Sequence, residues 1–245
     1  MANIGAVIFD MDGTLIDTEK LNVKFWKEAS RIAGFDVSAE DILYIRSLDP
    51  TLSSKYLEDK YPGFDFAEVR EIRRELMKQH VDNNGIEPKP GALELVKYLN
   101  SNNVKTAVAT ATGQERADRY LKLIGVSEYV DAIISTSNVG RGKPEPDVYL
   151  YVCDILDVIP KDAFAIEDSP FGVESAFKAG CRVIMVPDLT QPDEKTRMML
   201  THTDSSLSGL IGYFDRILNG RIQASSIHTM PDPHSDLAQG CISQV

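Results

Sequence analysis

Charged or hydroxyl side chains follow four short apolar runs of the sequence. A pair of carboxylates comes directly after each of two runs, a threonine ends a third, and a lysine lies in the loop after a fourth. If these runs are parallel strands of one sheet, their carboxyl ends meet at one edge, where ligands bind in open α/β sheets. The six residues expected in this crevice are Asp10, Asp12, Thr110, Lys143, Glu167 and Asp168.

The residue types at this edge indicate magnesium and a phosphorylated ligand. Carboxylates held close together repel one another unless they share protons or a cation. Ligands that offer only oxygen suit a hard divalent ion, and Mg²⁺ usually binds one or two carboxylates together with a substrate phosphate. Lys143 and Thr110 would then supply positive charge and a hydrogen bond to the phosphoryl oxygens.

The sequence pattern of the elements that position these residues predicts a doubly wound α/β fold. Most of the apolar runs are continuous rather than alternating, as in strands buried on both faces. Helical patterns lie between them, for example Ala92 to Asn100 and Arg116 to Ile124, so the strands form one parallel sheet. The predicted strands are Ala6 to Phe9, Val104 to Ala109, Val130 to Ser135, Ala163 to Ile166 and Arg182 to Val186.

The first two predicted strands are more than ninety residues apart, which indicates an inserted domain. Residues 18–86 show no strand pattern, and Ser38 with Asp41 and Asp65 with Glu68 read as capping boxes that open helices. We therefore predict a core domain of residues 1–16 and 88–218, a helical domain of residues 17–87, and a flexible tail of residues 219–245.

Four segments together resemble the haloacid dehalogenase superfamily. Their order along the chain and their places after predicted strands make the signal specific, and the resemblance covers residues 5 to about 190. The segments are Asp10-Met11-Asp12-Gly13-Thr14-Leu15 with Asp17, Thr110 in Ala-Thr-Ala-Thr, Lys143 in Gly-Lys-Pro-Glu-Pro-Asp, and Glu167-Asp168-Ser169 with Gly172.

The resemblance implies a role for each of these residues. Asp10 attacks phosphorus to give an aspartyl-phosphate, and Asp12 protonates the leaving oxygen and later deprotonates water. Mg²⁺ is the implied cofactor. Its implied ligands are the side chain of Asp10, the backbone carbonyl of Asp12, Asp168 and Glu167, and the residues expected to bind phosphate or substrate are Thr110, Ala111, Lys143 and Glu19.

The inserted domain resembles the four-helix cap of the subgroup that contains β-phosphoglucomutases and many sugar-phosphate and nucleotide phosphatases. A cap that closes over the crevice would exclude water and contact the leaving group. Glu19 could instead be only a first-turn acid of its helix, and Trp26 could simply pack between cap helices. The candidate specificity residues are Glu19, Asn22, Trp26, Arg46 and Lys55.

We expect a phosphatase acting on a small phosphorylated metabolite such as a sugar phosphate or nucleotide. A sugar-phosphate mutase like β-phosphoglucomutase is the alternative, but those enzymes carry a histidine where this chain has Asn22. Arg70, Arg73 and Arg74, which could bind a bisphosphate, are expected on a solvated helix face among glutamates. A non-catalytic binding or regulatory module is a second alternative, and the intact set of reactive groups argues against it.

Composition narrows the partners and the compartment. The net charge of −11 and the pI of about 4.9 disfavour binding to nucleic acids and to anionic membrane surfaces. No basic leader or long apolar span is present, so we expect a cytoplasmic protein, and the lack of an extra apolar stripe favours a monomer. Cys153 and Cys181 read as small core residues, while His228, His234 and Cys241 match no metal-ligand spacing.

Overall fold

The computed structural model of the chain describes residues 4–46 and 48–220 and contains one six-stranded sheet. All neighbouring strands are parallel, in the order β3-β2-β1-β4-β5-β6. The five predicted strands are confirmed to within two residues at each end, and the doubly wound fold class is confirmed. The strands are β1 (Ala6–Phe9), β2 (Lys105–Thr110), β3 (Ala132–Ser135), β4 (Ala163–Glu167), β5 (Arg182–Met185) and β6 (His202–Thr203).

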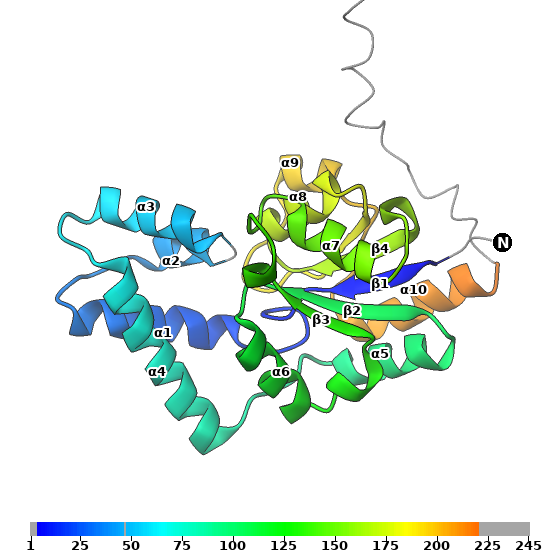
Figure 1. The fold of residues 1–245 in the computed structure, drawn as a ribbon, viewed down its shortest axis with the longest axis horizontal. Helices are drawn as coiled ribbons and strands as arrows, with labels where there is room; N and C mark the ends of the chain where they lie inside the picture. The colour runs from blue at the N-terminus through cyan, green and yellow to red at the C-terminus, as the bar shows by residue number, and fades with distance from the viewer. Residues whose placement is uncertain (1–3, 47, 221–245) are drawn as a thin grey trace, which may run out of the picture.

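Helices cover both faces of the sheet because both faces are apolar (Figure 1). Alternate side chains of β1 point to opposite faces. Val7 and Phe9 belong to one hydrophobic cluster, and Ala6 and Ile8 belong to the other. The first cluster includes residues of α5 (Ala92–Ser101), α6 (Gln114–Leu123) and α10 (Leu207–Leu218), and the second includes residues of α7 (Asp147–Ile155) and α8 (Pro170–Lys178).

Shorter helices complete the sheet region. They are α9 (Glu194–Met198) and the 3₁₀ turns Ser127–Tyr129, Thr136–Asn138 and Pro160–Asp162. The strand β6 was not predicted from the sequence, because its two residues offer no apolar run.

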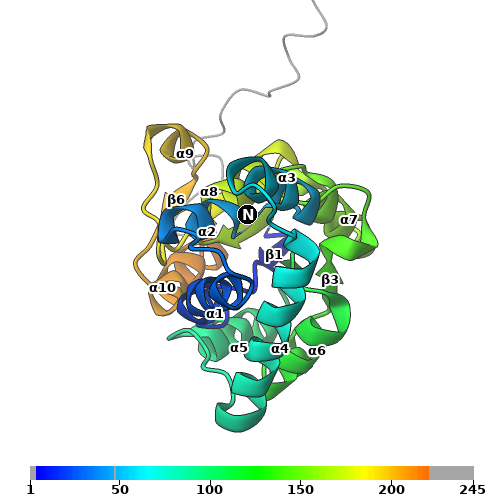
Figure 2. The ribbon, with the colours of Figure 1, turned by 90° about the vertical axis from the view of Figure 1, so that its left-hand side faces the viewer.

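A separate group of helices stands beside the carboxyl edge of the sheet, at the left of Figure 1. Figure 2 views the molecule from this side. The helices are α1 (Glu19–Ile32), α2 (Ala39–Ile45), α3 (Pro50–Lys60) and α4 (Phe66–Asn84). We call them the helical insertion. They share a hydrophobic cluster that includes Trp26, Leu57 and Val69, and the predicted helix caps at Ser38 and Asp65 are present.

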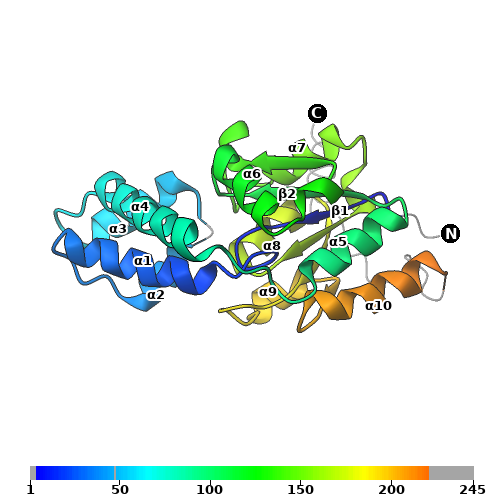
Figure 3. The same ribbon diagram turned by 90° about the horizontal axis from the view of Figure 1, so that it is seen from below.

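Two antiparallel chain segments join the helical insertion to the sheet. Ile16 pairs with Pro88 in an isolated bridge. The amide of Asp17 donates to the carbonyl of Glu87 at 2.9 Å, and the amide of Lys89 donates to the carbonyl of Leu15 at 2.9 Å. Figure 3 shows both segments passing between the two groups of helices. These two segments are the covalent connection between the helical insertion and the sheet.

Several predictions concern residues outside the site. Cys153 and Cys181 are buried, as predicted for small core residues. His228, His234 and Cys241 lie outside the described residues. Among the residues that the structure describes, no helix has the length and apolar character needed to cross a bilayer.

Candidate active site

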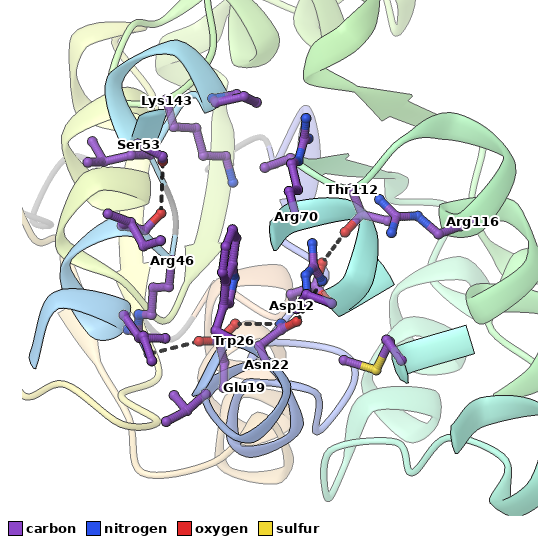
Figure 4. Close-up of a pocket in the computed structure, with 18 of the residues that line it drawn as sticks. Asp12, Glu19, Asn22, Trp26, Arg46, Ser53, Arg70, Thr112, Arg116 and Lys143 are labelled. Carbon is purple, nitrogen blue, oxygen red and sulfur yellow. Dashed lines mark hydrogen bonds and ion pairs between the residues drawn. The ribbon is translucent and has the colours of Figure 1, made fainter. Parts of the chain in front are cut away.

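The register of the sheet brings the predicted residues to one edge. Phe9 pairs with Val108 of β2 and with Ile166 of β4. The amide of Asp10 continues this ladder by donating to the carbonyl of Ile166 at 2.9 Å. Residues that follow these three strands must therefore meet, and they do so in a cavity between the sheet edge and the helical insertion (Figure 4).

Lys143 forms the buried centre of this edge. Its Nζ donates to Asp10 Oδ1 and Glu167 Oε1, both at 2.6 Å, and to the carbonyl of Ala109 at 3.2 Å. Burial by itself would lower the pKa of Lys143, but the two carboxylates outweigh burial and raise that pKa above its usual value. Lys143 thus stays cationic beside the position where a phosphoryl group would meet Asp10.

Glu167 is held from a second side by Tyr149. The Tyr149 hydroxyl donates to Glu167 Oε1 at 2.6 Å, and both side chains are fully buried. The sequence analysis missed Tyr149, because its place in the apolar pattern of α7 is that of an ordinary core aromatic. This contact makes Tyr149 a positioning residue for the pair of Glu167 and Lys143.

Three carboxylates of the site fit a divalent cation. Asp10, Glu167 and Asp168 are buried, and one oxygen atom of each lies within 4.8 Å of the others. Burial raises the pKa values of Asp10 and Asp168 well above the usual range, and neighbouring carboxylates add to the increase. Mg²⁺ would relieve this repulsion with the oxygen ligands that it prefers.

The carboxylate of Asp12 has hydrogen-bond partners of its own. Thr18 Oγ1 donates to Asp12 Oδ1 at 2.6 Å, and Thr112 Oγ1 donates to Asp12 Oδ2 at 2.7 Å. Both carboxylate oxygens are therefore fixed by hydroxyl groups. Asp12 lines the cavity, and its hydrogen-bond partners are hydroxyl groups, whereas Asp10 pairs with the cationic Lys143.

Thr110 and its neighbours differ in their access to the cavity. Thr110 is fully buried, and its Oγ1 accepts a hydrogen bond from the amide of Thr112 at 3.0 Å. Ala111 and Thr112 line the cavity. Thr112 was not singled out from the sequence, although it lies three residues beyond the end of a predicted strand, where a hydroxyl is a usable signal.

The helical insertion contributes a buried ion-pair network. Arg46 contacts Glu19 Oε2 at 3.3 Å and Asp168 Oδ2 at 3.2 Å, and it donates to the carbonyl of Asp168 at 3.1 Å. Burial raises the pKa of Glu19 to about 8, although Arg46 opposes this increase. Asn22 and Trp26 also line the cavity, and Trp26 stacks on Phe66 as well. Trp26 thus packs within the helical insertion, as one expectation had it, and also lines the cavity.

Two expectations for charged residues of the helical insertion are wrong. Lys55 does not line the cavity. It is exposed on α3 and pairs with Asp59 at 2.9 Å, which is one turn away on the same helix. Arg70 and Arg73 line the cavity rather than a solvated face, because α4 turns that side toward the sheet edge. Only Arg74 fits the expected mixed charge run, through Glu71 at 3.0 Å.

The family follows from a match that spans most of the chain. The sequence pattern of haloacid dehalogenase-like hydrolases matches residues 7–186, which include all four segments that carry the resemblance. The chain belongs to this family. The resemblance that the sequence analysis found is thus confirmed.

Relatives of known name place the chain among phosphatases of this family. The phosphorylated carbohydrates phosphatase of Thermotoga maritima is 31% identical over 175 residues, which are 71% of this chain and 81% of the relative. The structure of CbbY from Rhodobacter sphaeroides with phosphate is 26% identical with a TM-score of 0.72, covering 84% of this chain and 96% of CbbY. A β-phosphoglucomutase from Clostridium difficile shares the fold at 22% identity, with a TM-score of 0.70 and coverage of 89% and 98%.

Proposed function

We propose that this haloacid dehalogenase-like hydrolase is a Mg²⁺-dependent phosphatase that acts on a small phosphorylated metabolite through an aspartyl-phosphate. The observation that carries the proposal is the separation of two carboxylates in one cavity. Asp10 is paired with a buried lysine, and Asp12 is held by the hydroxyls of Thr18 and Thr112. Asp10 can thus act as the nucleophile while Asp12 acts as the general acid and base.

In the first half of the reaction, a carboxylate oxygen of Asp10 attacks the phosphorus atom. The bond from phosphorus to the leaving oxygen breaks, and Asp12 donates a proton to that oxygen. Lys143 holds Asp10 in place and stabilises negative charge on the phosphoryl oxygens. Mg²⁺ bound by Asp10, Asp168 and Glu167 would neutralise further charge on the phosphoryl group.

In the second half, Asp12 takes a proton from water. The water oxygen attacks phosphorus, the bond between phosphorus and the Asp10 oxygen breaks, and inorganic phosphate leaves. The hydroxyls of Thr18 and Thr112 orient Asp12 for both proton transfers. Asp10 and Asp12 return to their starting states.

The helical insertion would act as a cap. Glu19, Asn22, Trp26 and Arg46 form the wall of the cavity opposite the sheet edge, where a leaving group would lie. A cap that closes there would exclude water while Asp10 attacks phosphorus. It would then admit the water molecule that hydrolyses the aspartyl-phosphate. We therefore propose residues 17–87 as the cap domain and residues 1–16 and 88–218 as the catalytic domain.

Two features favour hydrolysis over the mutase alternative. The Thermotoga maritima relative is named as a phosphatase of phosphorylated carbohydrates, which makes sugar phosphates the first substrates to test. Asn22 lies in the cavity as a neutral amide whose Oδ1 accepts from Arg73 at 3.1 Å, so no proton-transferring histidine occupies this place.

The test is phosphate release from sugar phosphates and nucleotides with Mg²⁺, run beside conversion of β-glucose 1-phosphate to glucose 6-phosphate. We expect release from a small set of esters and slower isomerisation than hydrolysis. Isomerisation that outruns hydrolysis would favour the mutase alternative. No reaction in either assay would favour the binding-module alternative.

A further inference from the structure

Three arginines gather at one end of the cavity. Arg70 and Arg73 come from α4 of the helical insertion, and Arg116 comes from α6 beside the sheet. Figure 4 shows Arg70 and Arg116 on the side of the cavity where Thr112 lies, away from Arg46. Two structural units thus bring positive charge to the same place. We call these three residues the arginine group.

The arginine group has no carboxylate partner among residues 4–46 and 48–220. Arg73 donates to the neutral Oδ1 of Asn22 at 3.1 Å and lies over the ring of Trp26, with 5.4 Å from Cζ to the centroid. Its Nε is buried and makes no hydrogen bond. By contrast, Arg46 in the same cavity pairs with two carboxylates. The absence of carboxylate partners is therefore a feature of the arginine group and not of every arginine in the cavity.

The charges of the group repel one another in a partly buried place. Burial and the neighbouring Arg116 lower the pKa of Arg73 to about 10. Burial lowers the pKa of Arg70 as well, and Arg74 and Arg116 add to that effect. An anion bound between the three guanidinium groups would remove this repulsion and form charge-assisted hydrogen bonds.

The position of the group relative to Asp12 shows which part of a substrate it would meet. The phosphoryl group under attack belongs beside Asp10 and Lys143, where positive charge is already supplied. Asp12, which would protonate the leaving oxygen, lines the same cavity as the arginine group, and its charge acts on Arg73 by raising the pKa of that side chain against burial. The arginine group therefore faces the leaving part of a substrate rather than the transferred phosphoryl group.

We propose that the arginine group binds a second anionic group, a phosphate or a carboxylate, on the leaving part of the substrate. The inference rests on the proposed phosphatase function and narrows its substrate class to esters that carry another negative charge. The chain has a net charge of −11, which repels a substrate with two anionic groups. A local positive site would offset this repulsion.

The test compares matched esters. One pair is fructose 1-phosphate and fructose 1,6-bisphosphate, which differ by a phosphate, and the other is glucose 6-phosphate and 6-phosphogluconate, which differ by a carboxylate. We expect kcat/KM to be at least about tenfold higher for the member of one pair that carries the second anionic group, since charge-assisted hydrogen bonds to that group would strengthen binding. The favoured pair identifies the anion.

Variants assign this preference to the arginine group. Arg73→Gln and Arg116→Gln, which lie on different structural units, should each reduce the ratio of kcat/KM values by about tenfold, mainly through KM. Arg74→Gln is the matched control. It removes the same charge from the next position of α4, where the partner is Glu71 outside the cavity, and should keep the ratio.

The outcomes separate this inference from the proposed function. Hydrolysis of the esters without a second anionic group, with no preference for either member that carries one, would overturn the inference and leave the phosphatase standing. A preference that survives in both Arg73→Gln and Arg116→Gln would overturn it too. If no ester is hydrolysed under any condition, the proposed function fails and the inference fails with it.

Discussion

Gly13 shows how a single residue lets the catalytic turn pass close to the metal ligands. Its φ is +88°, a conformation that residues with a side chain rarely adopt. Its amide donates to the carbonyl of Ile16 at 2.9 Å, which closes the turn. A Cβ atom at this position would lie 2.5 Å from Asp168 Oδ2 and 2.7 Å from Glu19 Cγ.

Gly13→Ala should therefore impair catalysis through displacement of Asp168. We expect kcat for phosphate release to fall by about 100-fold, the size of effect that follows from moving reacting groups by about 1 Å. Gly34→Ala is the control, because Gly34 has the same φ of +88° but no atom within 4 Å of a new Cβ. It should lose about 1–2 kcal/mol of stability to backbone strain alone and keep its kcat. Equal activity of the two variants would contradict this account.

Sequence reasoning at this scale worked where a reactive residue directly follows a strand. Asp10 and Asp168 could be placed at one edge because parallel strands must end together, and the loop after β3 brings Lys143 to the same edge. Sequence reasoning failed for Arg73, which was expected on a solvated face and lines the cavity instead. The direction of its side chain depends on how α4 is rotated about its axis against the sheet domain, and a mixed charge pattern does not determine that rotation.

Asp41 connects the elements of the helical insertion. It lies in α2, and the side chains of Tyr56, Lys60 and Tyr61, from α3 and its end, donate to its carboxylate together with Ser38. Burial by itself would raise the pKa of Asp41, but these hydrogen bonds outweigh burial and hold that pKa well below its usual range. The charged form of Asp41 therefore stabilises the packing of α2 on α3.

Asp41→Asn should destabilise the protein in a pH-dependent way. A carboxylate with a lowered pKa adds stability above the unfolded-state pKa of about 4, and this is lost as the pH falls through the folded-state pKa. We expect a loss of about 1–3 kcal/mol in the free energy of unfolding at pH 7, shrinking below about pH 4. The measurement is urea unfolding at several pH values.

Asp59→Asn is the control for this prediction, since Asp59 and its partner Lys55 are exposed. Its loss should stay below about 1 kcal/mol. A loss for Asp41→Asn that is the same at pH 3 and pH 7 would show that the charge of Asp41 is not the cause.

Element prediction from the sequence was accurate where hydrophobic period and end signals agreed. The strands had continuous apolar runs with turn residues between them, and Ser38 and Asp65 marked helix starts through their hydrogen bonds to Asp41 and Glu68. The packing of the helical insertion on the sheet domain could not be predicted, because it depends on long-range pairs such as Arg46 with Asp168.

At the scale of the whole molecule, several contacts connect the helical insertion to the sheet domain, among them the ion pair of Asp82 with Arg119 and two contacts beside the cavity. Arg46 reaches Asp168 from the end of α2, and the amide of Asp49 donates to the carbonyl of Lys143 at 3.0 Å. Together with the two linking segments, these contacts hold the two units against each other. The amide of Asp49 therefore reports directly on their separation.

Arg46→Met should favour separation, because it leaves Glu19 and Asp168 without their cationic partner. We expect hydrogen exchange at the Asp49 amide to become about tenfold faster, or more. Amides of β1 should keep their exchange rates. Arg74→Met, which breaks an ion pair within α4 alone, should leave the Asp49 amide unchanged. An unchanged Asp49 amide in Arg46→Met would mean that Arg46 does not hold the units together.

The central claim is that Asp10 is the nucleophile of a Mg²⁺-dependent phosphatase, and phosphate release by wild type and Asp10→Asn tests it most directly. With a substrate ester and Mg²⁺, wild type should release phosphate, EDTA should abolish release, and added Mg²⁺ should restore it. Asp10→Asn should lose at least about 10⁴-fold in kcat, whereas Asp36→Asn, an exposed carboxylate on the helical insertion, should match wild type. Turnover that persists in Asp10→Asn, or in EDTA, would contradict the account.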